Sequence, residues 1–237
     1  MRLSGVGIAD TFFYTGLSNS QFGDPDVLEK QRWLVAQQAD RYIIGPADIH
    51  NGSLIGIYKS CWLVVGERAR VVAERAFKNQ FYMKSALNFT SSVELIDDEA
   101  FYNNFNAPSI SLGPNTKTIG DYAFFNCYSL QGELDLERTT GLGEYSFYRC
   151  QGLQSLVISE ELEEIKSHTF YNCNGLTSPL SMQNTAISGI GDNAFFNSNK
   201  IPSLSLPPNL KEIQFNAFRE CTGLSNEISF PSSLEYI

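Results

Sequence analysis

The sequence lacks several features that would place it in common classes of protein. It has 17 lysine and arginine residues against 26 aspartate and glutamate residues, so the basic footprint of a nucleic-acid or anionic-membrane binder is missing. No apolar run approaches the ~20 residues of a transmembrane helix. Residues 1–13 show no signal peptide, because Gly5, Gly7 and Asp10 interrupt the apolar stretch. We therefore expect no nucleic-acid partner and no membrane insertion, and either an intracellular chain or a natural start elsewhere.

Residues that could carry catalysis or bind a metal are also few. The chain has only two histidines, His50 and His168, and neither lies in a motif that joins a nucleophile to a base. The acidic groups at residues 97–99 and 160–164 lack the spacing of a calcium loop and are typical of a soluble surface. GVGIAD at residues 5–10 lacks the third glycine of a nucleotide-binding loop. The sequence predicts no catalytic residues, metal site or cofactor.

What is present suffices for a folded core. Hydrophobic residues make up 43% of the chain and aromatic residues 13%, which excludes a wholly disordered protein. A length of 237 residues allows one elongated domain or two small ones.

A unit of about 23 residues recurs along most of the chain. Each copy is anchored by a phenylalanine, with a small residue directly before it and an apolar residue five positions before it. The anchors are Phe77, Phe101, Phe124, Phe147, Phe170, Phe195 and Phe218. An alternating apolar pair separates successive anchors, at Leu87/Phe89, Ile110/Leu112, Leu134/Leu136, Leu156/Ile158, Leu180/Met182, Leu204/Leu206 and Ile228/Phe230.

This pattern predicts a solenoid. An apolar residue at every second position is typical of a short strand with one buried face. One such unit cannot bury its apolar side chains alone, but stacked copies form a continuous core. Parallel strands lie ~4.8 Å apart, so each recurring position becomes a column of like side chains, with the phenylalanine column in the middle of the core.

The repeats resemble the BspA-like class of leucine-rich repeats, whose consensus is roughly LxxLxLPxxLxxIGxxAFxxC. The resemblance is carried by LGPNTKTIGDYAFFNC at residues 112–127 and LPPNLKEIQFNAFREC at residues 206–221. It covers residues 61–237 and implies a curved, mostly β, right-handed solenoid. It also implies a cell-surface or secreted protein of bacteria or single-celled eukaryotes that serves in adhesion or partner binding.

The two ends depart from the repeat. Residues 1–60 are interpreted as degenerate repeats or an N-terminal cap with a helical insertion. Asp24-Pro25-Asp26 is a good helix start, and a helix could run to about Asp40. The phenylalanine expected five residues after Ile237 is missing, so we expect a fragment of a longer chain, truncated in mid-repeat.

Four of the five cysteines share one column, three positions after the anchor phenylalanine: Cys127, Cys150, Cys173 and Cys221. A spacing of about 23 residues strings them along a stripe, whereas zinc ligands cluster. Asn104 and Ser198 occupy the same column, which favours small buried residues that can bond turn carbonyls over disulfides. Cys61 lies outside the column.

Two columns are candidate binding surfaces. The position after the anchor forms an aromatic strip of Tyr102, Phe125, Tyr148, Tyr171 and Phe196. This strip either faces outward as an interaction site or packs over the turn to shield the core. The outward position of the strand pair forms a ladder of mostly short polar side chains, namely Asn88, Ser111, Asp135, Val157, Ser181, Ser205 and Ser229, which suits a broad partner.

The function we expect is a non-enzymatic module that binds a protein or cell-surface partner through an extended repeat face. A structural spacer that holds a separate functional domain is the alternative. A hydrolase that uses acidic residues of the N-terminal quarter is the third possibility. Small-molecule chemistry needs a pocket with converging polar groups, and no motif predicts one.

Overall fold

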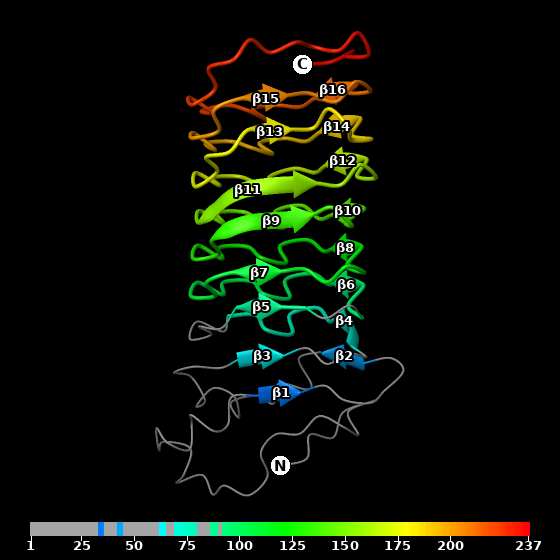
Figure 1. Cartoon of the computed structure of the whole chain (residues 1–237), viewed down its shortest axis with the longest axis vertical. Coiled ribbons are helices and arrows are strands. Elements are labelled where there is room, and N and C mark those ends of the chain that lie inside the picture. Colours follow the sequence, from blue (N-terminus) through cyan, green and yellow to red (C-terminus); the bar gives the residue numbers. More distant parts are fainter. Residues whose placement is uncertain (1–32, 36–41, 45–61, 65–68, 80–85, 90–91) are drawn as a thin grey trace, which may run out of the picture.

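The computed structural model describes residues 33–35, 42–44, 62–64, 69–79, 86–89 and 92–237. These residues form a stack of short parallel strands, with residues 33–35 near one end of the stack and residues 222–237 at the other (Figure 1). No helix occurs in the described part of the chain. The predicted mostly β solenoid is therefore confirmed. Each 23-residue repeat forms one coil, because its apolar face can be buried only against the coils before and after it.

Odd-numbered strands form one side of each coil. They are β1 (Trp33–Val35), β3 (Trp62–Val64), β5 (Leu87–Asn88), β7 (Ile110–Ser111), β9 (Gly132–Leu136), β11 (Leu153–Ile158), β13 (Leu180–Ser181) and β15 (Leu204–Ser205). They hydrogen-bond in the orders β1-β3-β5-β7, β9-β11 and β13-β15. Equivalent repeat positions pair, as Leu87 does with Ile110 and Leu180 with Leu204, and a register shift between Leu153 and Ser155 interrupts the β9–β11 pair. These are the predicted alternating pairs.

Even-numbered strands form the second side. They are β2 (Tyr42–Ile44), β4 (Ala69–Val72), β6 (Leu95–Ile96), β8 (Thr118–Ile119), β10 (Gly141–Leu142), β12 (Glu164–Ile165), β14 (Gly189–Ile190) and β16 (Glu212–Ile213). They pair in the orders β2-β4-β6-β8-β10 and β12-β14-β16. Each contains the apolar residue that lies five positions before the anchor, and in the described coils this residue is buried.

A turn segment around the anchor forms the third side of the coil. Two residues in each turn, two positions before and two after the anchor, have positive φ, for example Tyr122 (56°) and Asn126 (59°). Backbone N–H groups in the turn alternate between two kinds of acceptor. Phe124 N donates to Ser146 O of the next coil at 2.7 Å, whereas Phe125 N donates to Tyr122 O within its own turn at 3.1 Å. This alternation satisfies buried donors without a regular strand.

The anchor phenylalanines fill the core. Phe101, Phe124, Phe147, Phe170 and Phe195 are fully buried. Along the whole column from Phe77 to Phe218, neighbouring ring centroids lie 5.1 to 5.6 Å apart, with planes within 17° of parallel. The small residue before each anchor is buried between the two positive-φ positions, as expected for a residue that makes room for the turn.

The N-terminal quarter corrects one prediction. Trp33–Val35, in the middle of the predicted helix, is strand β1 and pairs residue for residue with Trp62–Val64. The helix prediction is wrong there, because pairing of a bulky apolar tripeptide with a matching strand outweighs weak local helix propensity. Ile44 of β2 pairs with Val72, the apolar residue five positions before Phe77. The predicted helix start at 24–26 lies outside the described residues, and the boundary at residue 60 stays a prediction.

Candidate functional site

The aromatic strip is partly packed over the turn and partly open to solvent, so it has features of both alternatives that the sequence left open. Its five rings stack face to face, with centroids 4.6 to 4.9 Å apart and planes within 11° of parallel. Every one of the five is half-buried. Most ring faces are therefore covered by neighbouring rings, and the strip presents mainly edges and hydroxyl groups to solvent. Burial raises the pKa of the Tyr148 hydroxyl above its ordinary value, so this group remains a neutral hydrogen-bond donor at physiological pH.

A second aromatic row lies beside the strip, and the sequence analysis missed it. Tyr122, Tyr145 and His168 occupy the positive-φ position two residues before the anchor. Tyr122 stacks on Tyr145 at 4.6 Å, and Tyr145 stacks on His168 at 4.3 Å. The sequence signal was present, because these three residues share one repeat column. Their proximity to the strip depends on the turn conformation, which the repeat spacing does not encode.

The two rows form one surface, which we call the aromatic face: Tyr102, Tyr122, Phe125, Tyr145, Tyr148, His168, Tyr171 and Phe196. Rings of the two rows approach within 5.6 to 5.7 Å in three successive coils. Burial raises the pKa of Tyr122 and Tyr145 and lowers the pKa of His168. All eight rings are half-buried. The face is therefore built of rigid, uncharged groups at neutral pH.

Cations from the same chain contact the aromatic face. In the column of the strip itself, Lys78 precedes Tyr102 and Arg219 follows Phe196. Lys78 Nζ lies 4.6 Å from the Tyr102 ring centroid, and Arg219 Cζ lies 6.0 Å from that of Phe196. The guanidinium of Arg149 lies 5.5 Å from the Tyr148 centroid. The two end faces of the ring stack are thus covered by cation–π contacts.

The strand-face ladder is more exposed than the aromatic strip. Asn88, Ser111, Asp135, Ser181 and Ser229 are exposed, Val157 is 36% exposed, and Ser205 is half-buried. Parallel pairing places Asp135 beside Val157 and Ser181 beside Ser205. The outward residues alternate along the strands with apolar residues that are mostly buried or half-buried, and two pockets of about 240 and 280 Å³ adjoin the ladder at Asp135 and at Ser205 and Ser229. A binding role for either surface remains a prediction.

The cysteine column is buried, as predicted. Cys127, Cys150, Cys173 and Cys221 are free thiols, and the first three donate to the carbonyls of Phe101, Phe124 and Phe147 at 3.2 Å. Ser198 donates in the same way to Phe170 O at 3.1 Å. Burial raises the pKa of Cys127 to about 12, which makes it a poor nucleophile and metal ligand. Cys61 lies outside the described residues.

Some of the acidic residues form structural hydrogen bonds or ion pairs. Asp98 Oδ1 accepts from Asp121 N at 2.7 Å, and Asp121 Oδ1 accepts from Glu144 N at 2.8 Å, so these side chains link successive coils. Glu99 forms ion pairs with Arg75 and Lys78. Among the described residues, no three His, Cys, Asp or Glu side chains gather closely enough to hold a metal ion. His50 and residues 5–10 lie outside this part of the chain.

Among the described residues, no helix has the length and apolar character that a membrane crossing requires.

Comparison with solved structures finds bacterial leucine-rich repeat proteins. A leucine-rich repeat protein of T. pallidum has a TM-score of 0.51 and 20% identity, over 95% of this chain and 83% of that one. One from Eubacterium ventriosum has a TM-score of 0.56 and 24% identity, over 75% and 56%. A leucine-rich cell surface protein of Faecalibacterium prausnitzii has a TM-score of 0.51 and 19% identity, over 84% and 60%. The chain thus spans less than two thirds of the last two proteins.

No curated protein sequence matches this chain. Among protein families, the BspA type leucine-rich repeat region matches residues 70–188 and 140–237, in six copies. These matches cover more than half of the chain and include every anchor phenylalanine from Phe77 to Phe218. The chain therefore belongs to the BspA-type leucine-rich repeat family, as its repeated sequence predicted.

Proposed function

We propose that this chain is a non-enzymatic binding module that captures a protein or cell-surface partner, in a protein that is secreted or displayed at the cell surface. Membership of a repeat family supports the binding role, because stacked coils offer extended area. One structural relative is described as a cell surface protein, which supports the proposed location. Adhesion is the specific role that we propose for this binding.

The observation that carries the proposal is the aromatic face. Tyrosine and other aromatic residues are enriched at the energetic centres of protein interfaces. A ring that is already held by stacking loses little conformational entropy on binding, since its two side-chain torsions are fixed in advance. The stacking distances of 4.6 to 4.9 Å along the strip describe such a preorganised surface.

The test is a comparison of matched variants. The Tyr148→Ala, Tyr171→Ala double variant removes two central rings, and Tyr148→Phe, Tyr171→Phe keeps the rings but removes their hydroxyl groups. Immobilised chains are incubated with host-cell and extracellular-matrix extracts, and bound proteins are quantified. We expect the alanine variant to lose capture by at least about tenfold, with a smaller loss for the phenylalanine variant. Circular dichroism of each variant checks that the fold is retained.

Equal capture by the alanine variant and the unaltered chain would contradict the role of the aromatic face but leave the strand-face ladder as the binding surface. The exposure of Ser111, Asp135 and Ser181 favours that second surface. Its own test is the Asp135→Arg, Ser181→Arg double variant, which adds two bulky cations to the ladder and should abolish capture through it.

A spacer is supported by a different observation, the hydrogen bonds that join the turn segments of every pair of neighbouring coils from Arg75 to Arg219 and stiffen the solenoid. Failure of the unaltered chain to capture any protein from either extract would favour the spacer.

A further inference from the structure

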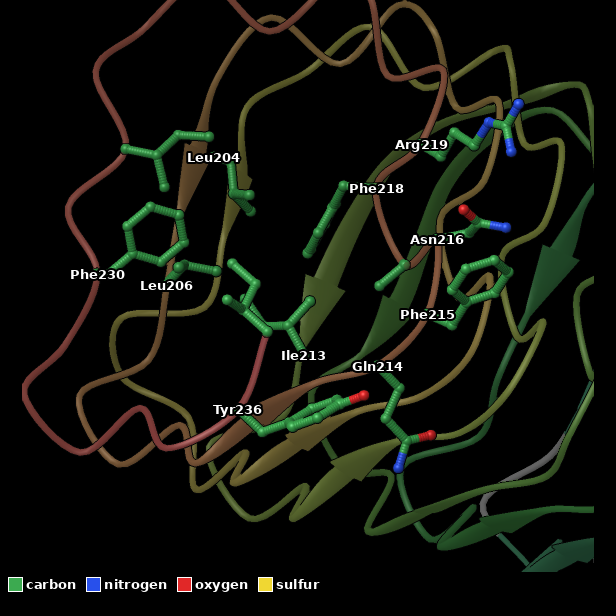
Figure 2. A pocket seen from close by; sticks show the side chains of 13 residues that line it. Leu204, Leu206, Ile213, Gln214, Phe215, Asn216, Phe218, Arg219, Phe230 and Tyr236 are labelled. Carbon is green, nitrogen blue, oxygen red and sulfur yellow. The ribbon is translucent and has the colours of Figure 1, made fainter.

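The residue after each anchor phenylalanine lies on the outer side of its turn. Figure 2 shows this division at residues 215–220, where Phe218 points toward Leu206 and Ile213 and Arg219 lies on the opposite side of the turn. Arg219 occupies the repeat position of the aromatic strip. The half-buried rings of the strip therefore line the outside of the solenoid, one ring in each coil.

The spacing of the strip is nearly constant along the solenoid. Tyr102 lies 4.7 Å from Phe125, and Phe125 lies 4.6 Å from Tyr148, measured between ring centroids. The planes of these rings are within 5° of parallel. Two coils therefore span about 9.3 Å, which is the length of one turn of a polyproline II helix, with three residues at 3.1 Å each.

Other regular conformations of a bound polypeptide do not match this spacing. An α-helix has a pitch of ~5.4 Å, so it would move out of register by about 0.7 Å at every coil. A β-strand laid along the axis repeats every two residues, at ~6.6 Å, which corresponds to neither one coil nor two. Among these conformations, polyproline II alone places equivalent groups at every second coil.

The exposed groups of the strip complement a polyproline II backbone. The hydroxyl groups of Tyr102 and Tyr148, two coils apart, form no hydrogen bond within the described part of the chain. The edges of aromatic rings carry partial positive charge. A polyproline II helix has carbonyl oxygens without internal partners, and its prolines have no N–H group. Donors two coils apart on this surface therefore match carbonyls three residues apart on the ligand.

A row of carboxylates runs beside the aromatic face. Asp98, Asp121 and Glu144 lie three positions before the anchor in successive coils. Burial raises the pKa of Tyr122, and the charges of Glu144 and Asp121 add to this shift, which shows that the row lies close to the rings. Asp98 and Glu144 are exposed and are two coils apart. Negative charge thus recurs with the same two-coil period as the hydroxyl groups of the strip.

We propose that the aromatic face binds a proline-rich polypeptide in the polyproline II conformation, laid along the solenoid axis, with lysine or arginine at every third position. This inference rests on the proposed function, because it names the partner of the same surface. Carbonyls three residues apart accept from Tyr102 and Tyr148, and the prolines pack on the ring edges. The cations lie beside Asp98 and Glu144. A helix with three residues per turn has three edges, so its third edge faces solvent.

The test compares two peptides of the same composition. The ordered peptide repeats the triplet proline-proline-lysine four times, so all its lysines lie on one edge of the helix. The scrambled peptide has the same prolines and lysines, but its lysines fall on all three edges. Fluorescence anisotropy of the labelled peptides gives their affinities for the full chain at about 0.15 M salt. We expect the ordered peptide to bind at least about fivefold more tightly.

Variants of the chain separate the two contacts. Tyr102→Phe with Tyr148→Phe removes two hydroxyl groups but keeps the stacked rings, and it should weaken the ordered peptide by at least about fivefold. The matched control is Tyr236→Phe, which removes an exposed hydroxyl group outside the aromatic face and should leave the affinity unchanged. Asp98→Asn with Glu144→Gln removes two charges, while the amide oxygen at position 98 can still accept from Asp121 N. This pair should reduce the preference for the ordered peptide.

Three results would overturn the proposal. The first is equal binding of the two peptides, which would reduce their binding to general attraction between a cation and an acidic protein. The second is equal affinity of the Tyr102→Phe, Tyr148→Phe chain and the Tyr236→Phe chain for the ordered peptide. The third is no binding of either peptide. If the Tyr148→Ala, Tyr171→Ala chain still loses capture from extracts in that case, the proposed function stands and only this inference fails.

Discussion

At the scale of single residues, asparagine has a repeated structural task in this protein. Five asparagines occupy the positive-φ position two residues after the anchor: Asn79, Asn103, Asn126, Asn172 and Asn197. Asparagine tolerates this conformation better than most residues. Its amide also bonds the same position in the coil before, as from Asn103 to Asn79 and from Asn126 to Asn103 at 3.0 Å. The column is therefore a side-chain ladder parallel to the backbone ladder.

Arg149 interrupts this ladder. Its φ is 59°, like that of the asparagines, but it offers no amide to the coil before it. Asn126 Oδ1 is consequently buried without a hydrogen-bond partner among the described residues. A buried acceptor without a partner costs about 1–3 kcal/mol, and the exposed contact of Arg149 with Tyr148 returns only about 0.5–1 kcal/mol.

We predict that Arg149→Asn stabilises the protein by roughly 1 kcal/mol, because it restores the missing amide donor and suits the positive φ. Urea unfolding gives the free-energy difference. Arg149→Ala is the matched control, since it removes the same cation without supplying an amide, and it should destabilise the chain. A midpoint for Arg149→Asn at or below that of the unaltered protein would show that the unpaired Asn126 oxygen costs little.

At the scale of elements, the phenylalanine column joins the coils. Phe147 has stacked rings on both sides, Phe124 at 5.2 Å and Phe170 at 5.6 Å, and it is fully buried. Phe218 has one stacked neighbour and is half-buried. The two residues occupy the same repeat position, but Phe147 has a stacked ring on both sides and Phe218 on one side only. The same substitution at both therefore measures what the second neighbouring ring contributes.

We predict that Phe147→Ala lowers the free energy of unfolding by about 3–5 kcal/mol, the usual cost of removing a buried ring. Phe218→Ala should cost roughly 1–2 kcal/mol, since less of its apolar area is removed from water in the first place. Urea unfolding monitored by circular dichroism measures both. Similar losses for the two variants would indicate that stacking on both sides adds nothing to the stability of an inner coil.

At the scale of the whole molecule, a buried cysteine thiol recurs in four coils along the axis. Burial raises the pKa of Cys127 and Cys173 to about 12 and that of Cys221 to about 11, from an ordinary value of 9.0, and it raises the pKa of Cys150 well above that value. A raised folded-state pKa means that the folded chain keeps these protons when the unfolded chain loses them. The stability is therefore fully present below about pH 9 and is lost as the pH rises toward the folded pKa values.

We predict that the free energy of unfolding falls above about pH 9, with a limiting slope of ~1.4 kcal/mol per pH unit for each buried thiol. The comparison chain carries Cys127→Ser, Cys150→Ser, Cys173→Ser and Cys221→Ser, a replacement that the column already contains at Ser198. Urea unfolding under reducing conditions, from pH 7.5 to 10, should give a flatter profile for this chain. If stability falls with pH equally in the two chains, the thiols are not the cause of the fall.

Much of the architecture followed from periodicity. In a stacked solenoid each residue contacts the residue one repeat length further along the chain. Residues at the same position in successive repeats must therefore lie in one column. The phenylalanine core, the buried residue five positions earlier, the paired strands and the hydrogen-bonding cysteines were predictable for this reason. Trp33–Val35 was not, since this isolated apolar tripeptide forms a strand only because the matching strand Trp62–Val64 lies beside it.

The sequence by itself determined which residues share a column, because its 23-residue interval matches one turn of the chain. Only the tertiary structure decided which columns lie next to each other. Positive φ on both sides of the anchor turns Tyr122, Tyr145 and His168 toward the aromatic strip. Backbone dihedrals and inter-coil hydrogen bonds set these directions, and neither is a property of repeat spacing.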